Sequence, residues 1–145
     1  MDSTQTALET LIDTVYDSVE GYQKAADLAK TPALKQALAG QSAKRQETLD
    51  MLNAELVRLG GDLVTKGTMT GGLHRLWLDL TALFESGDEA AVERVEEGEE
   101  YLAKKFEEVL EHTDLDRTTR AVIEAAHAEV RDGARFTAQL DQQYD

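Results

Sequence analysis

The residues best placed to do chemistry are a glutamate and a histidine three positions apart, Glu124 and His127. Helical bundles that hold two metal ions take one glutamate from each of two helices and a Glu-x-x-His pair from each of the other two. Three more acids, Glu20, Glu96 and Glu99, fall in other helical segments. These five side chains define a candidate site for iron or manganese.

Helical periodicity argues against the convergence of these ligands. At about 100° per residue, Glu124 lies roughly opposite the centre of the apolar stripe of its helix, and His127 lies at the edge. Glu20 falls outside the apolar arc of the first helix, and Glu96 flanks that of the third. Only Glu99 occupies a core-facing position. The sequence therefore favours a role without catalysis or metal, and a di-metal, ferroxidase-like protein is the alternative.

Arg45 is a basic residue in the middle of an apolar helical stripe. The stripe consists of Leu34, Leu38, Leu49, Leu52, Leu56 and Leu59. Glu99 interrupts the stripe of a later helix in the same way. The two residues predict a buried ion pair that fixes how the helices align, and breaking such a pair typically costs about 3–5 kcal/mol. The alternative is that Arg45 holds an inward carboxylate or a bound anion at a site between helices.

A second candidate surface is formed by His74, Arg75 and Trp77 on a short amphipathic segment. Burial of Trp77 at one end of the helices, with its indole N–H on a carbonyl, is the structural interpretation. The functional interpretation is a docking patch for an acidic or peptide partner. Glycines inside two long helices, Gly21 and Gly98, each cost about 1 kcal/mol relative to alanine. We expect them to allow close approach of helix backbones.

Four long helices follow from apolar periodicity and from start and stop signals. The first three are expected at about 3–30, 32–59 and 88–112. The fourth is expected to begin after a turn at 114–116 and to end at about 140. A turn-rich connection over 60–72 precedes a short helix over about 73–86. No strand pattern competes, which predicts an all-α fold. One long crossover after the second helix is typical of ferritin-like four-helix bundles.

Composition restricts the partners and the location. The chain has 145 residues, of which 41% are apolar, which suits a single domain over 1–145. Its formal net charge of -14 repels nucleic acid and anionic membrane surfaces. The chain has no cysteine, and we find neither a signal peptide nor an apolar run long enough for a membrane helix. We therefore expect a cytoplasmic protein that contacts neither nucleic acid nor membrane.

Several motifs resemble those of a bacterial ferritin-like family catalogued as a domain of unknown function. They are Asp17-Ser18-Val19-Glu20-Gly21-Tyr22, Arg45, Leu59-Gly60-Gly61, Gly72-Leu73-His74-Arg75-Leu76-Trp77 and Glu96-Glu97-Gly98-Glu99-Glu100. The resemblance covers nearly the whole chain and implies a ferritin-like bundle without an established activity. The function that we expect is that of a non-enzymatic interaction or stress-associated protein. Its partner is an unknown protein or a second copy of the chain.

Overall fold

The computed structural model describes residues 3–65, 67 and 72–144 of the chain. Within these residues the helices are, in order, α1 (Ser3–Leu28), α2 (Pro32–Arg58), α3 (Gly72–Trp77), α4 (Leu80–Ser86), α5 (Asp88–His112) and α6 (Arg117–Tyr144). The described part of the chain contains no strand, which confirms the prediction of an all-helical fold. None of these helices is both long enough and apolar enough to cross a membrane.

Local sequence signals set the ends of the long helices. Thr31 caps α2, because its Oγ1 accepts the backbone N–H three residues further on, and Pro32 takes the first helical position. Gly60 follows α2 with a φ of 93°, in the left-handed region that glycine adopts without strain. Asp116 caps α6 by accepting the backbone N–H of Thr119 at 2.8 Å.

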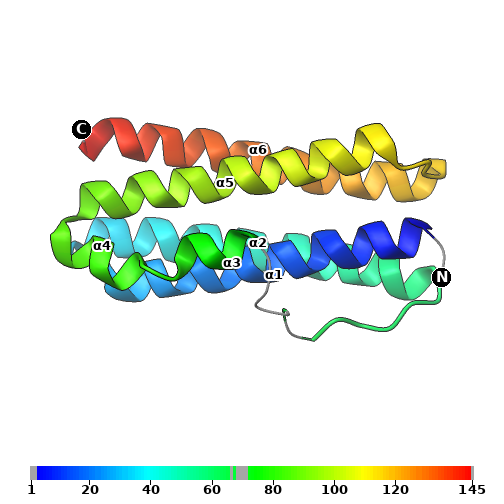
Figure 1. The fold of residues 1–145 in the computed structure, drawn as a ribbon, viewed down its shortest axis with the longest axis horizontal. Helices are drawn as coiled ribbons and strands as arrows, with labels where there is room; N and C mark the ends of the chain where they lie inside the picture. Colours follow the sequence, from blue (N-terminus) through cyan, green and yellow to red (C-terminus); the bar gives the residue numbers. More distant parts are fainter. Residues whose placement is uncertain (1–2, 66, 68–71, 145) are drawn as a thin grey trace.

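The four long helices form two antiparallel pairs that pack against each other (Figure 1). α1 pairs with α2, and α5 pairs with α6. Between the pairs, α1 packs against α5 and α2 packs against α6. α2 and α5 run in the same direction, so the connection between them returns along the length of the helices (Figure 1). The two short helices α3 and α4 lie against α1 and α5.

The crossover helix differs from the prediction. A single helix was expected over about 73–86, but the structure has two short helices, α3 and α4, with a turn between them. Arg94 of α5 explains the break, because its Nη1 donates both to the carbonyl of Leu76 at 3.1 Å and to Asp79 at 2.6 Å. A carbonyl near the end of a helix needs such a donor when the next turn does not supply one.

The core is divided into two apolar clusters along the helices. The first is built from α1 residues up to Val19, the second half of α2, and the facing parts of α5 and α6. The second begins at Tyr22 and contains the first half of α2, the start of α5 and the buried residues of α3 and α4. Between the two clusters lie buried polar side chains: Ser18, Gln41, Ser42, Arg45, Thr48, Glu99 and Thr137.

A separate polar junction joins the end of α2 to the beginning of α6. Glu55 is 4% exposed and accepts hydrogen bonds from Thr119 at 2.7 Å and from Arg58 at 2.6 Å. The Arg58 hydrogen bond lowers the pKa of Glu55 below its usual value, against the effect of burial, and Thr119 adds to the lowering. Ionised Glu55 therefore stabilises this end of the helices.

Candidate functional site

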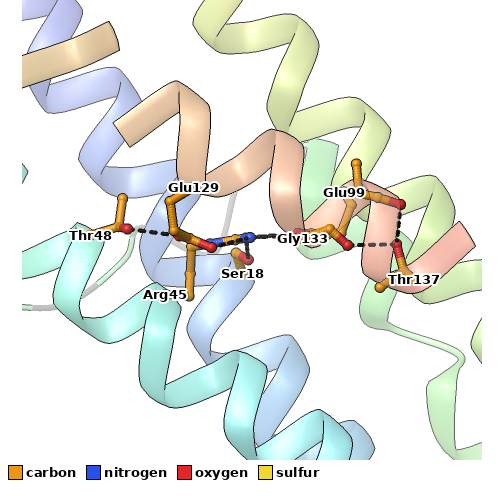
Figure 2. Close-up of polar contacts among 8 residues, drawn as sticks. Ser18, Arg45, Thr48, Glu99, Glu129, Gly133 and Thr137 are labelled. Carbon is orange, nitrogen blue, oxygen red and sulfur yellow. Dashed lines mark hydrogen bonds and ion pairs between the residues drawn. The ribbon is translucent and has the colours of Figure 1, made fainter. Parts of the chain in front are cut away.

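Arg45 occupies the centre of the polar layer between the two apolar clusters. It projects from α2 and is fully buried. Figure 2 shows three other helices supplying its partners: Ser18 from α1, Glu99 from α5 and Glu129 from α6. The layer thus joins all four long helices through one side chain.

Every N–H group of the Arg45 guanidinium has a partner. Nη1 and Nη2 bind the two oxygens of Glu99 at 2.7 and 2.6 Å, a bidentate ion pair. Nε donates to Glu129 at 2.8 Å, and Nη2 also reaches the second oxygen of Glu129 at 3.3 Å. Nη1 completes the set by donating to Oγ of Ser18 at 2.5 Å. A guanidinium has five N–H donors, and all five are used here.

The second carboxylate gives the cluster an excess of negative charge. Glu99 is 2% exposed, whereas Glu129 is 22% exposed and also accepts a hydrogen bond from Thr48 at 2.7 Å. With both acids ionised, one cation faces two anions. Because Glu129 lies at the edge of the layer, water solvates its carboxylate and screens the repulsion between the two carboxylates.

Electrostatics inside the cluster favour the charged form of Arg45. Burial alone would lower the pKa of the guanidinium, but the charge of Glu99 and its hydrogen bonds outweigh burial and raise this pKa above its usual value. The ring of Tyr22 lies 5.6 Å from the guanidinium carbon, within the range of a cation–π contact. Burial, and after it the charge of Glu99, raises the pKa of the Tyr22 hydroxyl well above its usual range. Near neutral pH, the guanidinium of Arg45 therefore stays protonated and the hydroxyl of Tyr22 stays neutral.

A glycine on α6 makes room for the ion pair. A Cβ on Gly133 would collide with Oε2 of Glu99 and would stand 2.8 Å from Nη2 of Arg45. One turn further along, Thr137 donates to the carbonyl of Gly133 at 3.1 Å (Figure 2). Only glycine therefore allows α6 to pass this close to the charged groups.

Sequence reasoning singled out Arg45 and Glu99 but missed the rest of the cluster. Ser18 and Glu129 were passed over because one is small and the other stands among several surface acids on its helix. The sequence of α6 does contain a signal that Glu129 faces the interior. Glu129 precedes the apolar-stripe residue Val130 and stands four residues before Gly133, so it shares a helix face with a glycine.

The five candidate metal ligands occupy different environments. Glu20 and Glu124 are exposed, and Glu96 is partly buried on α5. Glu99 is bound to Arg45. His127 is 16% exposed and stacks on a phenylalanine, with its Nε2 3.6 Å from a carboxylate of α5. Across residues 3–65, 67 and 72–144, no three histidine, aspartate or glutamate side chains are grouped so as to hold a metal ion.

Trp77 differs in burial from its neighbours His74 and Arg75. It is 5% exposed, and its indole Nε1 donates to the main-chain carbonyl of Asp17 at 2.9 Å. The ring fills a gap in the core and its N–H binds a carbonyl, which is the environment that the structural interpretation of Trp77 describes. His74 is partly buried and Arg75 is exposed.

The indole also explains the two helical glycines. A Cβ at either Gly21 or Gly98 would collide with the Trp77 ring. The sequence predicts two backbones in close approach at these positions. Instead, a side chain from α3 is inserted between α1 and α5, and the glycines leave space for it.

The sequence places this arrangement in a known family. Residues 3–112 match the family described as Domain of unknown function (DUF2383). The chain belongs to this family. The part that matches DUF2383 contains Arg45, Glu99 and Trp77, and it ends before α6, which carries Glu129 and Gly133. No curated protein and no solved structure matches the chain.

Proposed function

We propose that this chain is a non-enzymatic, ferritin-like helical bundle that acts through contacts of its surface with another protein or with a second copy. The observation that carries the proposal is the complete use of the Arg45 donors by Glu99, Glu129 and Ser18. A bound anion would have to displace one of these partners. A metal ion would have to take Glu99 from its cation. The buried cluster is therefore best explained as architecture.

The architectural role that we assign to the cluster is alignment of the helices. Sliding one long helix by a single turn moves its side chains by about 5.4 Å, more than any hydrogen bond can follow. Such a slide would leave at least one buried charge without its partner, whereas leucine contacts re-form in several registers. Buried polar residues fix the register of coiled coils in this way. We infer the same use for Arg45 here.

The order of the helices supports the ferritin-like assignment. Two antiparallel pairs are joined by one long crossover after the second helix, and α2 and α5 consequently run in the same direction. A bundle with one long crossover is the arrangement that ferritin-like folds have. In this chain the crossover carries α3 and α4, and Trp77 anchors it between α1 and α5.

The charge of the surface narrows the class of partner. A formal net charge of -14 opposes association with phosphate backbones and anionic lipid surfaces. A protein with a complementary basic surface suits this charge, and so does a second copy that meets this chain through a weakly charged face. We propose an interaction or stress-associated role in a bacterial cell on this basis.

Photo-crosslinking in the native cell tests the proposed function. A photoreactive residue would replace, one at a time, an exposed residue of α2, of the turn between α3 and α4, of α5 and of α6. These residues are Ala39, Leu78, Glu93 and Ala128. Replacement of buried Leu52 is the matched control, because its side chain cannot reach a partner. The proposal predicts an adduct of discrete mass from at least one of these positions and none from the control. Absence of adducts from all four positions would contradict it.

A further inference from the structure

Asp17 is a buried carboxyl group that the Arg45 cluster does not use. The residue is 1% exposed, and neither of its carboxyl oxygens has a hydrogen-bond partner in the part of the chain that the structure describes. A Cβ on Gly67 would stand 3.1 Å from Oδ1, so the backbone of Gly67 packs close to the carboxyl. A buried carboxylate is normally stabilised by several donors. Among the described residues, none donates a hydrogen bond to an ionised Asp17.

The same residue also holds helix α3 in place. The main-chain carbonyl of Asp17 accepts the indole N–H of Trp77 at 2.9 Å. The Trp77 ring is inserted between α1 and α5, where Gly21 and Gly98 leave room for it. The buried carboxyl and the carbonyl that anchors α3 therefore belong to the same residue of α1.

The charges around Asp17 act mainly against its ionisation. Burial is the largest cause that raises its pKa, from 3.8 to about 6, and the negative charge of Asp13 on α1 adds to the effect. His74 on α3 acts in the opposite direction, and Glu20 on α1 raises the pKa further.

We propose that the proton on Asp17 controls how firmly α3 is docked on α1. The neutral carboxyl fits beneath Gly67, and α3 stays in place. Once the proton leaves, the carboxylate gains water when Gly67 and α3 separate from α1. Docking of α3 therefore weakens as the carboxyl ionises. This inference does not depend on the proposed function.

The sign and size of the effect follow from proton linkage. The docked form binds the proton with a pKa of about 6, and the undocked form has the ordinary value of 3.8. The equilibrium constant for opening α3 is therefore smallest in acid, rises as the pH increases between these two values, and is level above pH 6. The difference between the two pKa values corresponds to an increase of roughly a hundredfold.

Hydrogen exchange of the α3 amides measures this equilibrium. Exchange would be followed by mass spectrometry across this pH range and divided by the intrinsic rate at each pH. Wild-type protein should show the roughly hundredfold rise, and Asp17→Asn should give a nearly constant value. His74→Gln should keep the rise but move its upper limit to higher pH, because it removes a charge that favours ionisation of Asp17.

Three results would overturn the inference. The first is a rise that persists in Asp17→Asn or disappears in His74→Gln. The second is an opening constant in α3 that equals that of α6 at every pH, because the proton would then act on global unfolding alone. The third comes from the wild type and needs no folded variant. A carboxyl ¹³C titration by NMR that gives Asp17 an ordinary pKa would remove the basis of the switch.

Discussion

Removing the charge of Arg45 should be the most damaging single change to the buried layer. Arg45→Met keeps most of the side-chain volume but leaves Glu99, 2% exposed, without a cation. Breaking a buried pair on one side typically costs about 3–5 kcal/mol. Against a total free energy of unfolding of about 5–15 kcal/mol, this loss is a large fraction of the stability. Glu129 is 22% exposed and keeps its Thr48 donor, so it adds less.

The partner change, Glu99→Gln, should cost less than Arg45→Met. Arg45 keeps Glu129 as a counter-ion, and the glutamine oxygen accepts one of its N–H groups. We expect a loss of about 2–3 kcal/mol, typical of a hydrogen bond to a charged group that is lost or weakened. Combining the two changes removes both charges. The double variant should therefore be more stable than Arg45→Met alone.

A double-mutant cycle measures this coupling. Free energies of unfolding would be obtained from urea titrations followed by circular dichroism at neutral pH. Arg135→Met is the matched control, because its pairing with Asp132 is exposed and such pairs contribute about 0–1 kcal/mol. Losses that add within about 0.5 kcal/mol would refute a direct pair between Arg45 and Glu99.

Three further changes test other parts of the structure. Gly133→Ala should destabilise by about 1–3 kcal/mol in thermal unfolding because of the collision with the ion pair, whereas Gly40→Ala, with nothing within 4 Å of its added Cβ, should stabilise by about 0.4–1 kcal/mol; equal effects would contradict the packing at Gly133. Glu55 has a lowered pKa, so its ionised form stabilises the fold above its unfolded pKa and this contribution is lost as the pH falls through the lowered value. Glu55→Gln should therefore be less stable than wild type at neutral pH in urea unfolding, with the difference vanishing in acid; a difference that persists in acid would count against it. Gly98→Ala should displace the ring of Trp77, the only tryptophan, and shift its fluorescence to longer wavelength; an unchanged spectrum would show that the ring is elsewhere.

The long helices were predictable because their end signals are local. Proline at position 32, glycine at 60 and the aspartate at 116 act within one turn of where they stand. The break between α3 and α4, in contrast, has no local signal in the sequence. It depends on Arg94, which is distant in sequence from the carbonyl that it binds, and periodicity carries no information about such a contact.

The candidate site was predictable only where a residue type was out of place. Arg45 and Glu99 interrupt apolar stripes and could be noticed individually. Ser18 and Glu129 are ordinary residues on helix faces, and their part in the cluster depends on how four helices pack. Trp77 illustrates the same limit, since two glycines on other helices receive its ring and no spacing in the sequence connects the three.

An architectural role for the buried cluster predicts that Glu99 stays bound to Arg45 and is not taken by a metal ion. Untagged protein would be loaded anaerobically with ferrous iron and with manganese, freed of excess metal, and measured by elemental mass spectrometry. We expect far less than one metal ion per chain, both for wild type and for Glu99→Gln. About two ions per chain, lost in Glu99→Gln, would identify a di-metal protein and contradict it.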